Sequence, residues 1–141
     1  MSSNNQNRPC QIALSSTRNI SPELLRDLYD SEPWWPERTT DDIDFILREH
    51  LAVGAWEGKN LIGFARAVSD FRFRAYIEDV LVIAEYRNRG IGRQLIQTLL
   101  DELSNIHVVT LFCQNKLTEY YTGLGFKEFS RQVVMHRRNI R

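Results

Sequence analysis

The stretch YRNRGIGRQL, from Tyr86 to Leu95, joins an apolar run to a long amphipathic pattern. The preceding AYIEDVLVIA, residues 75–84, predicts a strand buried on both faces. The following IGRQLIQTLLDELSN, residues 91–105, places its leucines and isoleucines on one helical stripe. A strand, a glycine-containing turn and a helix in this order predict a mixed α/β domain with this unit at its centre.

The turn itself has the composition of an anion site. Gly90 and Gly92 let the backbone approach a ligand without interference from a Cβ atom. The N–H groups of the first helical turn and the helix dipole favour a negative charge, and Arg87, Arg89 and Arg93 add charged donors. The stretch therefore predicts a phosphate or pyrophosphate seat. A glycine turn with a solvated basic rim is the structural alternative.

Two familiar phosphate motifs do not fit the turn. The dinucleotide-binding fingerprint needs a third glycine, and the corresponding position holds Leu95. The Gly-Lys-Ser/Thr sequence of the P-loop does not occur in the chain. The identity of the anion must therefore come from other parts of the chain.

The rest of the chain predicts further strands and helices around this unit. A strand pair is expected over residues 51–70, with its turn at Glu57–Asn60, where Gly58 allows a left-handed conformation. Ser21 and Pro22 predict one helix start, and Thr39 or Thr40 followed by acids predicts another. The other expected elements are strands at 10–15, 107–113 and 131–137 and a short helix at 116–124. The expected order is β-α-α-β-β-β-α-β-α-β.

Composition limits the possible functions. Lysine plus arginine and aspartate plus glutamate both number 18, so the net charge is zero and no general field attracts nucleic acid or an anionic membrane. No apolar run approaches the roughly 20 residues that span a bilayer. Cys10 and Cys113 are far apart and the histidines are scattered, so we expect reduced thiols and no metal site. We predict a cytoplasmic protein with a flexible polar tail, residues 1–8, and a single domain, residues 9–141.

Two sequence motifs resemble those of one superfamily, and their order and spacing also agree with that superfamily. Arg87-Asn88-Arg89-Gly90-Ile91-Gly92 matches the R/Q-x-x-G-x-G/A signature of the GCN5-related N-acetyltransferases, and Tyr121 to Phe126 matches their Y-x-x-x-G-F element. The order of elements from Cys10 to about Arg137 also fits. The resemblance implies the superfamily fold, a central mixed and mostly antiparallel sheet flanked by helices, with splayed central strands.

The resemblance also implies acetyl-CoA as the cofactor. Its pyrophosphate would rest on the backbone amides of residues 88–93, and its pantetheine arm would run beside the end of the central strand like an added strand. Asn115 lies near the superfamily's cofactor-contacting asparagine, one residue short of the usual spacing, and a helix cap is its alternative role. The implied cofactor contacts are Val80, Leu81, Val82, Arg87, Asn88, Arg89, Gly90, Ile91, Gly92, Arg93 and Asn115.

The resemblance assigns catalytic roles to two side chains. Tyr121 matches the tyrosine that protonates the departing CoA thiolate, with packing in the core beside Phe126 as the structural alternative. Many relatives carry a glutamate base where this chain has Tyr76. Glu78 lies two residues further, on the same face of a regular strand, and is the candidate general base.

The acids of the central strand have a competing interpretation. Glu78 can instead pair with an arginine, for which Arg66, Arg72 and Arg74 are the candidates. Asp79 would point to the opposite face of a regular strand and is expected to be structural.

The acceptor site is expected in the loop 31–38, where Trp34 and Trp35 would contact an amine or instead cover the core. The resemblance predicts transfer of an acetyl group to a primary amine by direct attack in a ternary complex. Both small amines, such as an arylalkylamine or a polyamine, and protein amines remain open. A non-catalytic acyl-CoA-binding module is the alternative function. We expect no nucleic-acid or membrane partner and regard a homodimer through residues after Val133 as possible.

Overall fold

The computed structural model describes residues 9–33 and 36–139. Five strands form one sheet in the order β1-β2-β3-β4-β5. All neighbouring strands are antiparallel except β4 and β5, which are parallel. The strands are β1 (Gln11–Leu14), β2 (Leu51–Glu57), β3 (Asn60–Ser69), β4 (Arg74–Val82) and β5 (Val108–Leu111).

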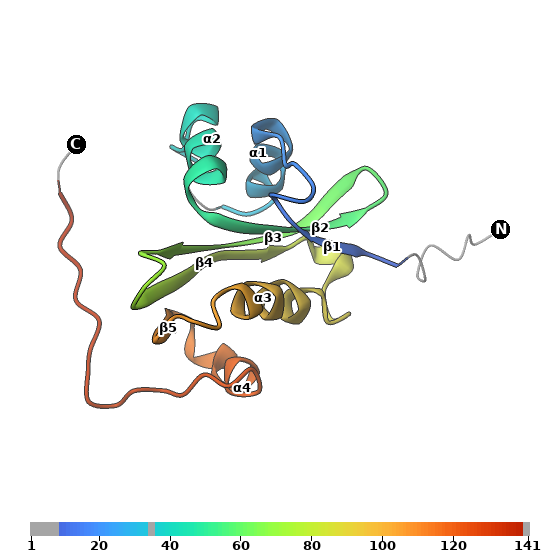
Figure 1. Cartoon of the computed structure of the whole chain (residues 1–141). Helices are drawn as coiled ribbons and strands as arrows, with labels where there is room; N and C mark the ends of the chain where they lie inside the picture. Colours follow the sequence, from blue (N-terminus) through green and yellow to red (C-terminus); the bar gives the residue numbers. More distant parts are fainter. Residues whose placement is uncertain (1–8, 34–35, 140–141) are drawn as a thin grey trace.

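Helices cover both faces of this sheet. Figure 1 shows α1 (Pro22–Asp30) and α2 (Thr40–Glu49) on one face, and α3 (Ile91–Glu102) with α4 (Thr118–Thr122) on the other. Two short 3₁₀ turns, η2 (Ala84–Tyr86) and η3 (Asn115–Leu117), precede α3 and α4. The mixed and mostly antiparallel α/β fold predicted from the sequence is therefore confirmed. Within the described ranges, no helix has the length and apolar character required to cross a membrane.

Each helical layer has its own apolar core. On the α3 face, Leu95, Ile96 and Leu99 are fully buried against residues of β2, β3 and β4. On the opposite face, Leu25 of α1 and Ile43 of α2 are fully buried. Because β3 contributes side chains to both cores, it is the best-covered strand of the sheet, with buried residues from Leu61 to Ala67.

The predicted starts of the first two helices are confirmed. The Ser21 hydroxyl accepts a hydrogen bond from the Leu24 N–H at 3.1 Å. Thr39 and Asp42 form a reciprocal capping box at the start of α2. The turn between β2 and β3 is also as expected, with Gly58 at a φ of 56°.

The middle of β4 departs from a regular strand. Its pairing with β3 shifts by one residue, because Arg66 lies opposite Glu78 whereas Phe64 lies opposite Leu81. The additional residue forms a β-bulge in which Asp79 has a φ of 55°. A bulge reverses the side-chain alternation, so Asp79 lies on the same face as Glu78. The expectation that these two acids point to opposite faces is wrong for this reason.

Two other expectations about strands need correction. The expectation that β4 is buried on both faces is wrong, since Tyr76 and Glu78 before the bulge and Val80 and Val82 after it all retain some exposure. The strand expected at residues 131–137 does not form among the described residues. After Phe126, whose N–H bonds to the Tyr121 carbonyl, residues 127–139 are all exposed and have no regular secondary structure.

The contribution of the α3 core can be measured with one substitution. We expect Ile96→Ala to lower the free energy of unfolding by about 2–5 kcal/mol, because it opens a cavity in a fully packed region. The neighbouring Gln97 is exposed, so Gln97→Ala should change stability by about 0.5 kcal/mol or less. Urea unfolding of both variants checks this, and equal losses would contradict the assignment of the core.

Candidate active site

The candidate active site begins where two parallel strands part. β4 and β5 pair from Arg74 opposite Val108 to Ile77 opposite Leu111, and the pairing then stops although β4 continues to Val82. The last five residues of β4 therefore border a gap on this side. Since the Ile83 N–H donates to the Ile62 carbonyl of β3 at 3.0 Å, strand alternation directs the backbone of Leu81 towards β3 and that of Val80 and Val82 towards the gap.

The start of α3 lies directly after this strand end. Gln94 is the first residue whose N–H bonds back within the turn, to the Gly90 carbonyl at 3.1 Å. The N–H groups of Ile91, Gly92 and Arg93 precede it, and no side chain caps them. The first turn contains no acidic residue. Three free donors and the positive end of the helix dipole make this turn a suitable anion seat.

Two glycines shape the seat. Gly90 has a φ of 78°, and a Cβ atom there would meet nothing within 4 Å, so the position borders open space. At Gly92 a Cβ atom would come within 3.1 Å of the Tyr120 hydroxyl. Tyr120 therefore approaches the first turn of α3 closely. Its position over Gly92 makes Tyr120 an additional candidate for ligand contact.

The three arginines of the turn have structural contacts. Arg87 donates to the Val82 carbonyl at 2.9 Å through Nε and forms an ion pair with Glu32. The Arg89 guanidinium lies 5.0 Å from the centre of the Tyr86 ring. Arg93 donates to the Gly123 carbonyl at 3.3 Å, which ties α3 to the end of α4. Arg87 thus holds the turn against β4 and the segment that follows α1, and direct anion contacts from the arginines remain a prediction.

Tyr121 lies on α4, which follows β5 in the chain. Its ring packs edge-to-face against Phe126 at 6.0 Å, and it contacts the α3 core. Burial, together with Tyr120 and Cys113, raises the pKa of Tyr121 to about 12. The phenol is consequently protonated throughout the physiological pH range and can act as a proton donor.

Glu78 lies in the first position of β4 beyond the last pair with β5, and it belongs to a buried charged cluster. Arg66 of β3 is the centre of this cluster, with only 5% of its surface exposed. Its Nη2 donates to Glu78 at 2.5 Å and its Nε donates to Asp79 at 2.6 Å. Of the three arginines considered as partners for Glu78, Arg66 is the one found.

Asp79 carries most of the remaining contacts of the cluster. It accepts from the Tyr29 hydroxyl at 2.9 Å and from Arg38 at 2.8 Å, in addition to Arg66. Arg38 belongs to the segment between α1 and α2, so Asp79 connects that segment to β4. Arg66 Nη1 lies 3.0 Å from His50 Nδ1. Because a guanidinium only donates, His50 accepts at Nδ1 and carries its proton on Nε2.

The surroundings in the cluster shift the pKa values of its two acids in opposite directions. Burial raises the pKa of Glu78, with Asp79 adding to the rise and Arg66 opposing it. Burial also disfavours charge on Asp79, but Arg66 and Arg38 outweigh it and hold the pKa of Asp79 below its usual range. Asp79 is therefore a fixed negative charge, whereas Glu78 has the raised pKa that suits a proton acceptor.

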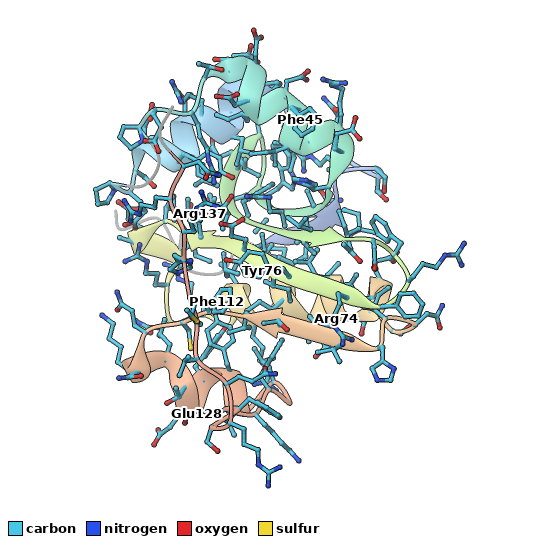
Figure 2. The ribbon with its side chains drawn as sticks, turned by 90° about the vertical axis from the view of Figure 1, so that its left-hand side faces the viewer. Phe45, Arg74, Tyr76, Phe112, Glu128 and Arg137 are labelled. Atoms are coloured by element: carbon cyan, nitrogen blue, oxygen red, sulfur yellow. The ribbon has the colours of Figure 1, made fainter. Side chains whose placement is uncertain are left out.

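A groove of about 320 Å³ lies on the same side of β4 as Glu78. The side chains of Tyr76 and Phe112 lie close together in it (Figure 2), with ring centroids 5.2 Å apart. Asp70 and Arg74 provide its charged groups. The groove is lined by Val68, Ser69, Asp70, Arg74, Ala75, Tyr76, Thr110 and Phe112.

The remaining predicted site residues have different outcomes. Asn115 is exposed in η3, and neither η3 nor α4 has a side-chain cap, so its alternative role as a helix cap is wrong. A role of Asn115 in cofactor contact stays a prediction. Trp34 and Trp35 lie outside the described residues.

The sequence did not identify the whole charged cluster. Tyr29, Arg38 and His50 come from three separate segments and have no motif in common. The available signal was Arg66, a single charge in the apolar run LIGFARAV. Such a charge needs a partner when buried, and the only other charges within an apolar strand are Glu78 and Asp79.

Comparison with known proteins identifies the family of this fold and site. The sequence profile of the Acetyltransferase (GNAT) family matches residues 17–126, which include the anion seat, the charged cluster and Tyr121. The chain belongs to this family.

Two relatives illustrate the match. Over 131 residues the chain is 34% identical to "Histone acetyltransferase TAP1" of Glycine max, covering 83% of this chain and 56% of the relative. It is 32% identical over 122 residues to "Uncharacterized N-acetyltransferase ycf52" of Porphyra purpurea, covering 82% of this chain and 70% of the relative. The chain thus spans little more than half the length of the soybean protein.

Solved structures share the fold at lower sequence identity. A GNAT family acetyltransferase of Streptococcus pneumoniae superposes with a TM-score of 0.80 at 21% identity, covering 93% of this chain and 98% of the other. A "predicted acetyltransferase with acetyl-CoA" of Clostridium acetobutylicum superposes with a TM-score of 0.67 at 20% identity, covering 91% of this chain and 96% of the other.

The charged cluster yields a test of stability against pH. We expect Asp79→Asn to lower the free energy of unfolding by about 3–5 kcal/mol at neutral pH, because it leaves buried guanidinium groups without their carboxylate. The pKa of Asp79 is lower in the folded protein than in the unfolded protein, so its charge stabilises the fold at pH values above the unfolded pKa of about 4. This stabilisation is lost as the pH falls through the folded pKa. The difference in free energy of unfolding between Asp79→Asn and the parent protein should therefore become smaller at acidic pH.

The matched control is Asp44→Asn, which removes an exposed ion pair with Arg48 on α2. Its cost should be about 0.5 kcal/mol or less. Urea unfolding across the pH range distinguishes the two variants. A penalty for Asp79→Asn that is independent of pH would show that its charge is not the cause.

Proposed function

We propose that the chain transfers the acetyl group of acetyl-CoA to a primary amine by direct attack within a ternary complex. The single observation that supports this best is the uncapped start of α3, which lies beside the gap between β4 and β5. One ligand with an anionic group and an extended arm fits both features. Acetyl-CoA has this form, and it supplies an activated acetyl thioester.

The residues of the turn and strand fit such a ligand. The N–H groups of Ile91, Gly92 and Arg93 would receive the pyrophosphate, and the space beside Gly90 leaves room for it. The backbone of Val80 would pair with the pantetheine arm. The Val82 carbonyl already accepts from Arg87, so this chain offers fewer free groups at the strand end than the sequence suggested.

Two side chains would transfer protons. Glu78 would accept the proton that the amine loses as its nitrogen bonds to the acetyl carbon, directly or through a water molecule. Tyr121 would donate its hydroxyl proton to the sulfur as the carbon–sulfur bond breaks, and it would regain a proton from solvent. Arg66 orients the Glu78 carboxylate and limits the rise of its pKa.

The groove beside Tyr76 and Phe112 supports an acceptor with an aromatic or apolar body. It opens on the face of β4 that carries Glu78, so an amine placed there would have its nitrogen near the gap. Backbone N–H groups of residues 72–74 hold the pKa of Asp70 below its usual range, so this carboxylate stays charged at the groove. A small arylalkylamine and an amine on a protein both remain within this proposal, and the cytoplasm stays the expected compartment.

The alternative is an acyl-CoA-binding module without catalysis. The direct ion pair between Glu78 and Arg66 favours it, because a carboxylate held by a guanidinium at 2.5 Å is a weaker base. Release of free CoA thiol from acetyl-CoA with a panel of amines separates the two functions. Binding of acetyl-CoA without turnover on any amine would establish the module.

The anion seat can be tested with two comparable glycines. Gly90 and Gly58 both have positive φ, and both border open space. Alanine at either position should cost about 1 kcal/mol of stability through backbone strain. Only Gly90→Ala should weaken binding of CoA, by tenfold or more, that is about 1.4 kcal/mol. Calorimetric titration with CoA measures this, and equal affinities of the two variants would exclude the seat.

The proton-transfer roles predict a specific pH dependence. In the parent protein kcat/KM should fall as the pH decreases through the raised pKa of Glu78, because a general base must be deprotonated. Glu78→Gln should lower kcat and remove this acidic limb. Tyr121→Phe should lower kcat by about 10²–10⁴-fold. Full activity of the phenylalanine variant would disprove the general-acid role.

A further inference from the structure

A second pocket, of about 240 Å³, opens on the face of the sheet that α1 and α2 cover (Figure 1). It lies where the loop after β1 meets the junction between α2 and β2. Ile20 and Ala52 line it and belong to the apolar core of this face. The Ser15 N–H donates to the Ala52 carbonyl at 2.9 Å and so joins the loop to β2. The pocket is therefore built into the fold on both sides.

The polar groups of this pocket favour a negatively charged ligand. The polar side chains are Ser15, Ser16, Asn19, Arg48 and His50. None of the described residues that line the pocket is acidic. The two serine hydroxyls and the Asn19 carboxamide form no hydrogen bond within the described part of the chain, so they are free to donate to a ligand.

Arg48 supplies the positive charge of the pocket. Its side chain is 61% exposed, and its Nε donates to Asp44 at 3.0 Å. Its Nη1 lies 3.9 Å from Glu49, which is too far for a hydrogen bond. The N–H groups on its two Nη atoms therefore remain available to a ligand. A guanidinium presents these groups as a planar fork that matches a carboxylate.

His50 connects the pocket to the charged cluster. Its Nδ1 accepts from Arg66 Nη1 at 3.0 Å, so its proton lies on Nε2, at the other side of the ring. The His50 N–H bonds to the Ile46 carbonyl at 3.0 Å, and Phe45 packs edge-to-face against the ring at 6.3 Å. Burial and the nearby Arg66 charge both lower the pKa of His50, which keeps the ring neutral at pH 7. One imidazole therefore accepts from Arg66 and retains a donor for a ligand.

We propose that this pocket binds a small carboxylate and that His50 conveys its presence to Arg66. Arg48 and the Nε2–H of His50 would donate to the carboxylate, and Asn19 would add a further donor. A bond at Nε2 would hold the ring in the tautomer that accepts from Arg66, and hydrogen bonds in such a chain polarise one another. The ligand must be small, because pockets for drug-sized molecules measure about 300–1,000 Å³.

The position of Arg66 gives the site a link to the other face of the charged cluster. Arg66 also donates to Glu78 at 2.5 Å, so an occupant that fixes His50 would influence the orientation of the candidate base. Only this last consequence rests on the proposed function. Binding of the carboxylate and its effect on Arg66 do not require that the chain transfers acetyl groups.

Malonate, a small dicarboxylate, tests the site by nuclear magnetic resonance of the full chain at pH 7. It should produce saturable shifts of the Asn19 side-chain amide, the His50 Nε2 resonance and the Arg66 Nε–H. Malonamide has a similar shape without the charge and should produce none. The Gly92 N–H reports on the anion seat at α3, so one titration separates the two anion sites and the two proposals.

Two substitutions that each remove one positive charge separate the pocket from general electrostatics. Arg48→Gln should weaken malonate binding by about tenfold or more, because it removes charge-assisted hydrogen bonds. Lys59→Gln changes an exposed residue of the β2–β3 turn, at the opposite end of β2, and should leave the affinity unchanged. Both positions are exposed, so both variants should fold as the parent does.

Three results would overturn the proposal. The first is the absence of a saturable shift at the pocket, including the case in which malonate shifts only the Gly92 N–H. The second is an equal affinity of Arg48→Gln and Lys59→Gln for malonate. The third is binding at the pocket that leaves the Arg66 Nε–H unchanged, which would refute the link through His50.

Discussion

The contact between the Asp79 bulge and Arg66 organises the side of this domain that carries the candidate active site. Before the bulge, Ala75 and Ile77 join the core under α3, and after it Leu81 joins the core under α1 and α2. One additional residue therefore reverses the faces of β4 half-way along. A non-glycine residue with positive φ costs on the order of 1–3 kcal/mol, and three donors on the Asp79 carboxylate offset that cost.

The same reversal directs the functional groups. It brings Glu78 and Asp79 to one guanidinium, and it turns the backbone of Val80 towards the gap. The cluster also separates the behaviour of its two acids, because Asp79 has two guanidinium partners and is more deeply buried, whereas Glu78 remains partly open to solvent. A single irregularity thus couples the positions of the candidate base and the candidate cofactor strand.

Local patterns predicted the local structure of this chain well. The caps at Ser21 and Thr39, the turn at Gly58 and the glycine turn before α3 all depend on residues close in sequence, and all four were found. The bulge was not predicted, because strand alternation assumes a regular register and no glycine marks the insertion. For the same reason, the face of the sheet on which the Asp79 side chain lies could not be predicted from its position in the sequence alone.

Residues 127–139 illustrate a second limit. The apolar and β-branched residues of 131–137 predicted a strand that does not form, because a strand also needs a neighbour and a single sequence does not say which one. The charged cluster has a similar origin, since Arg66 signals a buried partner while Tyr29, Arg38 and His50 reach it only through tertiary folding. Contacts between distant segments account for what the sequence left open.

The missing cap of α3 has a consequence for the whole protein. Ser21 and Thr39 accept hydrogen bonds from N–H groups in the first turns of α1 and α2, whereas no side chain caps α3. On the proposed assignment, a bound pyrophosphate would serve as the helix cap, and occupancy would become part of folding. The free energy of unfolding would then rise with the logarithm of the ratio of acetyl-CoA concentration to its dissociation constant once that ratio exceeds one, so the supply of acetyl donor would contribute to the stability of the protein itself.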